Sequence, residues 1–279
     1  MYAFAPSKSD VMPLVRRQLS VLVECLRGSP GPSARQHLCT LAADLFQLAG
    51  EISFDADNYT VAAHCYHQAA QAGKDAGAHD LWACALTRHA YLSVYEKRFA
   101  DAAPLLNLAA TIATRGDSEL STRHWVAAVQ GETFAGLGDL DACCRALDSA
   151  EEVAGLTGTV HNGGWLRFNG ARLPEERGTC YVTLGRPDLA EAALAEALDH
   201  ATSVRRRAGV LADLAVVGAQ RGDLDQVITH ADAVLKHAHE TRSGMIARKL
   251  LDLRPHLRPL RTDLRVRELD ARITTLTAA

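Results

Sequence analysis

A histidine- and cysteine-bearing segment, HCYH at 64–67, carries the residue types best suited to metal binding. His64 and His67 are three positions apart, so both rings would lie on one side of a helix and could supply two ligands. The remaining candidates lie singly on neighbouring expected helices: His37, Cys39 and Cys84. The alternative is a structural role for this segment, in which Tyr66 packs inward and His67 lies partly outside the packed face of the helix. Because no second ligand pair with fixed spacing accompanies the first, we expect no metal and no cofactor.

The Gly-Arg-Pro-Asp turn at 185–188 is a second candidate, because a glycine turn before a helix can bind phosphate. A phosphate loop needs several glycine amides and a following Lys, as in the motif GxxxxGKS/T. This turn has one glycine and no such Lys, and Pro187 removes an amide donor. Asp188 can instead cap the following helix. The sequence therefore predicts the elbow of a helical hairpin.

The sequence lacks the motifs of the common hydrolases and dinucleotide-binding enzymes. It has no GxSxG elbow, no HExxH and no glycine-rich dinucleotide fingerprint. Its 33 acidic residues fall mostly in settings typical of solvated helix faces, and Glu175 with Glu176 is the pair that could act together. We expect no enzymatic activity. An unrecognised enzyme acting on a bound substrate is the lower alternative, because helical scaffolds can host scattered catalytic groups.

The composition favours an all-α fold. Hydrophobic residues make up 48% of the 279 residues but aromatics only 5%, because Ala and Leu, both strong helix formers, fill the apolar share. The net charge of -3 gives no electrostatic footprint for nucleic acid. No run approaches the roughly 18 apolar residues of a membrane span. With 7 cysteines, no CxxC pair and no secretory signal, we expect reduced thiols in the cytoplasm.

Turn signals recur along the chain, and each precedes an apolar stretch with helical spacing. They begin at Asp57, Lys97, Gly138, Gly185 and Gly222, with spacings of 40, 41, 47 and 37 residues. Small residues or Val occur seven positions before, five after and twelve after every start. Around Gly185 these residues are Gly178, Ala190 and Ala197. The period indicates a helical repeat array, and the small side chains allow paired helices to approach closely.

The segment GTCYVTLGRPDLAEAALAEAL at 178–198 shows what one repeat contains. Its pattern is formed by Gly178, Tyr181, Gly185, Ala190, Leu194 and Ala197. The segment GETFAGLGDLDACCRALDSA has the same pattern at Gly131, Phe134, Gly138, Cys143, Leu147 and Ala150. Both resemble tetratricopeptide (TPR) repeats. The resemblance implies an all-α, right-handed TPR-like α-solenoid of about five helical hairpins, with helices or loops longer than in the usual repeat of about 34 residues.

The expected domain organisation follows from these repeats. The hairpins occupy about 35–75, 78–115, 118–155, 166–200 and 201–240. Before them, the N-terminal segment 1–34 holds one capping helix at 11–27. After them, 241–279 holds capping helices at 242–253 and 261–275, separated by RPHLRP. The glycine-rich stretch 155–165 is expected to be a loop.

Three longer segments resemble a narrower group of proteins. They are LAGEISFDADNYTVAAHCYHQAAQAGKDAG, GWLRFNGARLPEERGTCYVTLGRPDLA and the tail LRPHLRPLRTDLRVRELDARI. They are similar to the C-terminal sensor region of actinobacterial transcriptional regulators that join a helix-turn-helix DNA-binding domain to TPR repeats. The resemblance spans about Leu14 to Ile273 and lacks the DNA-binding domain, which needs more chain than precedes the first repeat. It implies a sensor of a peptide or small effector, either truncated or acting without contacting DNA directly.

Stacked hairpins curve, and the first helix of each pair lines the inner surface. Helical geometry then predicts which residues point into the concave groove. They are Gln47, Glu51, Arg88, Tyr91, Tyr95, Trp125, Glu132, Arg172, Glu175, Thr179, Arg205, Asp213 and Gln220. Arg206 accompanies Arg205, one turn earlier on the fifth first helix. Aromatic and Arg side chains in a concave surface favour ligand binding, although each alone could simply solvate a helix face. Trp165 and Phe168 could close over a ligand or bury their rings between repeats.

The function expected from these features is recognition without catalysis. The partner would be a peptide or protein, or a small-molecule effector, and binding would be linked to transcriptional control. The alternative is a constitutive protein–protein scaffold without an effector. We expect no direct binding of nucleic acid and no membrane association. Because the ends of a solenoid expose apolar surface, a homodimer through 261–275 is a further expectation.

Overall fold

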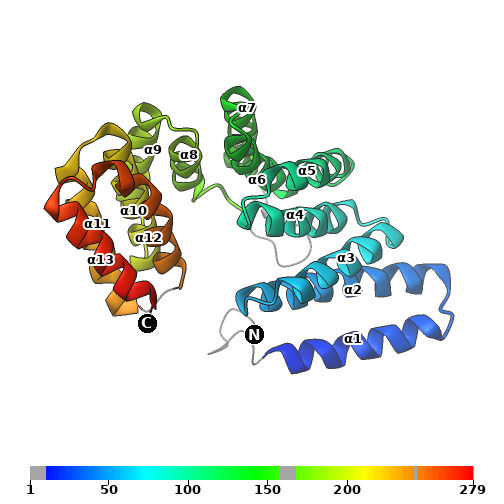
Figure 1. The fold of residues 1–279 in the computed structure, drawn as a ribbon. Coiled ribbons are helices and arrows are strands. Elements are labelled where there is room, and N and C mark those ends of the chain that lie inside the picture. Colours follow the sequence, from blue (N-terminus) through cyan, green and yellow to red (C-terminus); the bar gives the residue numbers. More distant parts are fainter. Residues whose placement is uncertain (1–10, 158–167, 242–243, 279) are drawn as a thin grey trace. The chain divides into compact units, whose positions relative to one another are not determined.

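The computed structural model describes residues 11–157, 168–241 and 244–278. Throughout these ranges the regular elements are helices without any strand, so the predicted all-α class is confirmed (Figure 1). Among the same residues, no helix has the length and apolar character needed to span a membrane. The chain divides into two compact units. The N-terminal unit comprises Met1–Leu137 and Asp141–Gly170, and the C-terminal unit comprises Gly138–Leu140 and Ala171–Ala279.

The N-terminal unit consists of consecutive helices that pack against one another. In its described part these are α1 (Met12–Arg27), α2 (Pro32–Asp55), α3 (Tyr59–Asp75), α4 (His79–Tyr95), α5 (Phe99–Ala113), α6 (Thr122–Leu137), α7 (Leu140–Glu151) and the short helix η3 (Glu152–Gly155). Each of α1 to α5 contacts the helix that follows it. In addition, α4 contacts both α2 and α6, so alternate helices are neighbours (Figure 1).

The C-terminal unit repeats this arrangement. Its described helices are α8 (Leu173–Thr183), α9 (Pro187–Asp199), α10 (Val204–Arg221), α11 (Leu224–Thr241), α12 (Gly244–Leu257), η4 (Arg258–Leu260) and α13 (Leu264–Ala278). Each α-helix contacts the next one along the chain, and α10 contacts both α8 and α12. In both units, therefore, every second helix supplies one member of a row of neighbouring helices.

The five predicted turn starts share one backbone conformation. Their φ angles are positive: Asp57 56°, Lys97 60°, Gly138 80°, Gly185 65° and Gly222 73°. Only glycine adopts this left-handed region without steric cost, because a Cβ would crowd the following carbonyl oxygen. The tight connection between paired helices thus explains why glycine stands at three of the five starts.

The small residues flanking each turn lie in the core between paired helices. Those five and twelve positions after the turn starts are at most 2% exposed: Ala62, Ala102, Cys143, Ala190, Val227, Ala69, Ala109, Ala150, Ala197 and Val234. A Cβ on Gly131 would lie 2.9 Å from Leu147 Cδ2. A Cβ on Gly50 would overlap the ring of Tyr66. The small side chains thus let the two helix axes approach closely.

The Gly-Arg-Pro-Asp turn connects α8 to α9. Arg186, rather than the predicted Asp188, occupies the N-cap position of α9, which begins at Pro187. Asp188 lies in the first helical turn, where its carboxylate accepts hydrogen bonds from Arg186 Nε at 3.0 Å and Nη2 at 2.7 Å. The charges of this turn pair with each other, as expected for a structural elbow.

The C-terminal tail departs from the expectation that RPHLRP separates two helices. Instead, α12 continues through Pro255 and ends at Leu257. Leu253 and Leu257, on either side of Pro255, are fully buried, so both remain packed in the core although Pro255 removes one backbone hydrogen bond from the last turn. The break falls later, at η4.

Candidate functional site

The predicted groove residues fall into two groups, one in each unit. In the N-terminal unit they lie on the neighbouring helices α2, α4 and α6: Gln47, Glu51, Arg88, Tyr91, Tyr95, Trp125 and Glu132. In the C-terminal unit they lie at the start of α8, on α8 and on α10: Arg172, Glu175, Thr179, Arg205, Asp213 and Gln220. α12 is the third of the alternate helices in the C-terminal unit, after α8 and α10, and it carries none of the predicted residues.

A buried polar row links the three helices of the first group. Gln47 is only 1% exposed, and its Nε2 donates to the Leu81 carbonyl oxygen at 3.4 Å. Its Oε1 accepts a hydrogen bond from Arg88 Nε at 3.3 Å. The Arg88 guanidinium lies over the ring of Trp125, 4.9 Å from the ring centroid, and its Nη1 is 3.8 Å from Glu51 Oε2. Arg88 is thus held by an amide, a carboxylate and an aromatic face.

Four half-buried aromatic rings lie beside this row. We call Phe54, Tyr59, Tyr91 and Tyr95 the aromatic cluster. Its centroid distances are 5.0 Å between Phe54 and Tyr95, 5.6 Å from Tyr59 to each of these rings, and 6.2 Å between Phe54 and Tyr91. These edge-to-face and tilted contacts hold the rings together. Each ring keeps part of its surface exposed to solvent.

Tyr59 anchors the aromatic cluster at the turn between α2 and α3. Its hydroxyl donates to Asp57 Oδ1 at 2.6 Å. This hydrogen bond, reinforced by partial burial, raises the pKa of Tyr59 above the usual range, because the phenolate would lose the bond. The hydroxyl therefore stays protonated at neutral pH. Its hydrogen bond ties the Tyr59 ring to Asp57, the residue of the turn that has a positive φ.

Glu132 extends the first group along α6. It is half-buried and lies seven residues after Trp125, about two helical turns further along the same side. With Glu51 it gives the first group two carboxylates, one on α6 and one on α2. The surface is therefore aromatic and acidic, since the Arg88 side chain is only 9% exposed.

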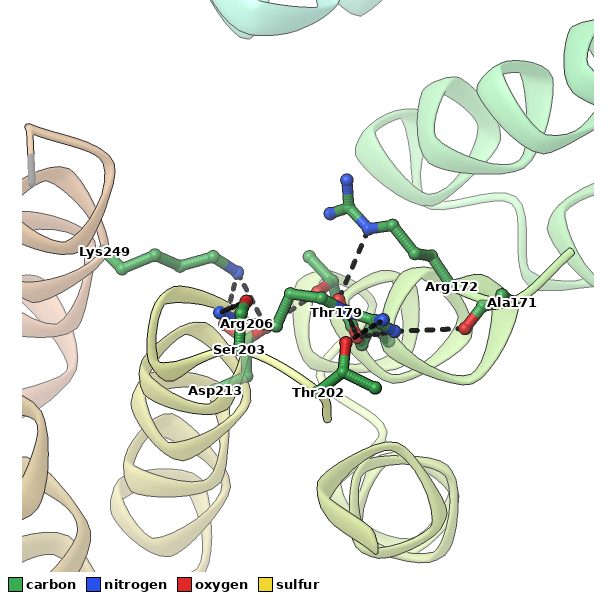
Figure 2. Close-up of polar contacts among 9 residues, drawn as sticks. Ala171, Arg172, Thr179, Thr202, Ser203, Arg206, Asp213 and Lys249 are labelled. Carbon is green, nitrogen blue, oxygen red and sulfur yellow. Dashed lines mark hydrogen bonds and ion pairs between the residues drawn. The ribbon is translucent and has the colours of Figure 1, made fainter. Parts of the chain in front are cut away.

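The second group contains a carboxylate held by two arginines, Arg172 and Arg206, which are labelled in Figure 2. Glu175, which is 9% exposed, forms an ion pair with Arg206 of α10. Arg206 Nη2 also donates to the Ala171 carbonyl oxygen at 3.0 Å. Arg172 reaches Glu175 with its Nε 3.4 Å from Oε2, and its side chain is 64% exposed. Arg172 is therefore the member of this cluster that a ligand can reach most easily.

A second buried carboxylate joins all three helices of the C-terminal row (Figure 2). Asp213 on α10 accepts a hydrogen bond from Thr179 Oγ1 on α8 at 2.7 Å. Lys249 on α12 donates to both oxygens of the same carboxylate, at 2.7 and 2.6 Å. Asp213 is 6% exposed, so these donors replace the water that its charge has lost.

The remaining predicted residues of this unit differ in exposure. Gln220 is half-buried and its Nε2 donates to the Val182 carbonyl oxygen at 2.8 Å, which ties α10 to the end of α8. Arg205 is exposed. Of these two neighbouring arginines, Arg206 makes the contact to Glu175.

Three residues of these clusters were not among the predicted ones: Phe54, Tyr59 and Lys249. Phe54 and Tyr59 flank the first turn, so aromatic residues on both sides of a turn start were an available signal. Lys249 lies 36 residues after Asp213, close to one repeat period, which is the signal that relates it to the array.

The histidine and cysteine candidates do not gather. His64 and His67 are exposed, whereas Tyr66, Cys39 and Cys84 are buried. Within residues 11–157, 168–241 and 244–278, the His, Cys, Asp and Glu side chains form no group of three or more that could hold a metal ion. Of the two loop aromatics, Phe168 is half-buried, and Trp165 lies outside the described residues.

Comparisons with known proteins do not identify a family for this chain. No protein-family model matches the sequence, and a search of curated proteins finds no match. The two groups of predicted groove residues, and the chemistry that they expose, are therefore the basis for assigning a function.

Proposed function

We propose that the protein is a non-enzymatic recognition module that binds a peptide or small effector on the exposed side of its alternate helices. The resemblance to the sensor region of actinobacterial regulators is one support, and it leads us to propose that binding is linked to transcriptional control. The clusters described above are the other support. Their residue types suit binding, because aromatic and Arg side chains are enriched at the centres of binding surfaces.

The finer fold that we propose is a right-handed TPR-like α-solenoid of about five hairpins with capping helices. The repeated contact between a small residue on one helix and a larger residue on the next supports it. So does the contact between alternate helices, because stacked hairpins place their first helices side by side. α1 and the pair α12 and α13 would then be the capping helices.

The observation that carries the functional proposal is the aromatic cluster next to the Arg88–Trp125 stack. Tyr91, Tyr95 and Trp125 are each half-buried and keep part of their surface exposed, and they belong to one group of neighbouring helices. The rings are held by one another and by Arg88, so little side-chain freedom is lost when a ligand binds. We propose that apolar side chains of a peptide pack on these rings.

A thermal-shift screen with short peptides and metabolites, followed by calorimetric titration of each hit, tests this proposal. Trp125→Ala and Tyr95→Ala are expected to weaken binding by about tenfold or more, the usual effect of removing a central aromatic contact. Trp82→Ala is the matched control, because Trp82 is half-buried and packs against a core cluster as Trp125 does, and it has Lys74 Nζ 5.9 Å from its ring centroid. It belongs neither to the aromatic cluster nor to the polar row around Arg88. Equal loss in all three variants would contradict a site at the aromatic cluster.

A constitutive scaffold is the second candidate function, and one observation favours it. Gln47, Glu175 and Asp213 are buried and hydrogen-bonded within the protein, so they stabilise helix contacts whether or not a ligand is present. A sensor should gain thermal stability with a small ligand, whereas a scaffold should respond only to a protein partner. If no peptide or metabolite shifts the melting temperature while a stable protein complex is isolated, the scaffold is the better description.

The cellular setting that we propose is the cytoplasm. All seven cysteines are free thiols in the structure, as is common in a reducing compartment. A homodimer through the C-terminal helix stays part of the proposal, and gel filtration at increasing concentration tests it. A monomer at the highest concentration would contradict the dimer without affecting ligand binding.

A further inference from the structure

The C-terminal unit contains a surface hollow that is separate from the clusters described above. Its volume is about 200 Å³, and it is formed by the end of α12, by η4 and by the turn that follows. We call it the arginine hollow, and its lining residues are Leu251, Arg254, Pro255, Arg258 and Arg261. Three of these five residues carry a permanent positive charge.

Two of the three arginines are fixed by one buried carboxylate. Asp270 on α13 is 8% exposed, and its two oxygens accept hydrogen bonds from Arg254 Nε at 2.6 Å and from Arg261 Nη2 at 2.5 Å. The hydrogen bond from Arg254 is the main cause that lowers the pKa of Asp270, so the carboxylate stays ionised at neutral pH. Each guanidinium carries several N–H donors and gives one to Asp270, which leaves donors available for a ligand.

Arg258 supplies the charge that Asp270 does not balance. Its guanidinium is exposed and has no hydrogen-bond or ion-pair partner in the part of the chain that the structure describes. Asp270 compensates one of the three charges, so an excess of positive charge remains at the hollow. Leu251, which is 42% exposed, and Pro255 form an apolar wall next to these donors.

We propose that the arginine hollow binds the phosphate group of a small ligand. Arginine forks match the oxygens of a phosphate, and two of them are already oriented by Asp270. The volume is smaller than that of sites for drug-sized ligands, about 300–1,000 Å³, so it suits a phosphate with only a few further atoms. This site goes beyond the recognition function proposed above and does not depend on the aromatic cluster.

Isothermal titration calorimetry of the full chain tests the proposal with inorganic phosphate and with glycerol 3-phosphate. Wild type is expected to bind both. Tighter binding of glycerol 3-phosphate would identify a phosphomonoester as the ligand, since its carbon atoms would contact Leu251 and Pro255. Equal binding would identify free phosphate. Arg258→Gln should weaken binding by about tenfold or more, the effect of losing one charge-assisted hydrogen bond.

Arg267→Gln is the matched control, because Arg267 is an exposed arginine on α13 outside the hollow. It should leave the dissociation constant unchanged. Both variants should melt at the wild-type temperature without ligand, since neither guanidinium has a partner in the described structure. Absence of binding by wild type, or an equal loss in Arg258→Gln and Arg267→Gln, would overturn the proposal.

Discussion

Gly178 on α8 lies directly against Leu194 on α9. A Cβ on the glycine would be 2.5 Å from Leu194 Cδ2 and 2.6 Å from Cγ, closer than real side chains approach. Leu194 is fully buried, so its side chain has no free space to move into. The glycine therefore determines how closely these two helices pack, and Gly131 has the same relationship to Leu147.

Gly178→Ala is expected to destabilise the protein by about 1–3 kcal/mol, the usual cost of overpacking a core. A decrease in stability would be informative, because replacing a helical glycine with alanine otherwise stabilises a protein by about 0.5–1 kcal/mol. Urea unfolding followed by circular dichroism measures the change. Gly155→Ala is the control, since a Cβ there would meet no atom within 4 Å. Equal stability of Gly178→Ala and wild type would show that the helices can separate without cost.

The helix pairs were predictable from the sequence because their determinants are local. Gly185, Ala190 and Ala197 recur at fixed offsets, and each offset translates directly into a turn or a packed helix face. The polar contacts were less predictable. Arg206 contacts Glu175 on the neighbouring helix α8, and the rotation of α10 decides which of two adjacent arginines does so. An error of one residue turns a side chain by about 100° around the axis, so Arg205 and Arg206 point in different directions.

The burial of Asp213 could not be predicted from its own segment either. Its main partner is Lys249, which lies on α12, a helix expected only to cap the array. Likewise Gln47 was predicted to point into a groove, but it is 1% exposed and accepts a hydrogen bond from Arg88 on α4. The spacing of residues in the sequence indicates on which side of its helix a residue lies. Whether that residue is buried depends on which side chains of the neighbouring helix pack against that side.

Lys97→Gly is expected to stabilise the N-terminal unit. Lys97 has a φ of 60°, which costs a residue with a Cβ about 1–2 kcal/mol, whereas glycine loses about 0.5–1 kcal/mol through its more flexible unfolded state. The net gain should therefore be about 0.5–1 kcal/mol in the free energy of unfolding. Lys97→Ala removes the same side chain but keeps the unfavourable φ, so it should give no gain. Stabilisation of both variants to the same extent would show that the lysine side chain, and not the backbone, causes the strain.

The pKa of His89 should depend on its neighbour His67. Burial is the first cause that lowers the pKa of His89, and repulsion by His67 lowers it further. His67→Gln should therefore raise the pKa of His89 while leaving it below about 6.5, the ordinary value. Two-dimensional NMR of the imidazole carbons measures the pKa of His89 in wild type and in His67→Gln. His230 provides the internal control, because burial lowers its pKa in the other unit and His67 should not affect it. An unchanged His89 pKa in His67→Gln would exclude the interaction.

The same shift predicts how the stability of the N-terminal unit depends on pH. A histidine whose folded pKa is lowered binds its proton more readily in the unfolded chain. His89 therefore stabilises the folded state least at acidic pH, and its contribution is lost as the pH falls from about 6.5 through the folded pKa. His89→Gln should flatten the stability profile in this range. A profile as steep as that of wild type would assign the acid sensitivity to another group.

Asp270 should give the C-terminal unit a stabilising contribution that depends on its charge. Hydrogen bonds from Arg254 and Arg261 lower the pKa of Asp270, so the contribution is present above the unfolded pKa of about 3.9 and is lost as the pH falls through the folded pKa. Asp270→Asn should therefore cost about 1–3 kcal/mol at pH near 7, because two guanidiniums lose a charged acceptor. The difference from wild type should narrow in strongly acidic solution.

Urea unfolding at neutral and acidic pH separates this electrostatic effect from simple packing. Asp232→Asn is the matched control, since Asp232 also pairs with an arginine of α13, Arg272 at 2.7 Å, but the side chains are 45% and 55% exposed. Solvent screens such a pair, so its loss should change stability little at either pH. A loss in Asp270→Asn that is equally large in strong acid would mean that Asp270 acts through its shape. In that case Arg254 and Arg261 would not depend on its charge for their orientation.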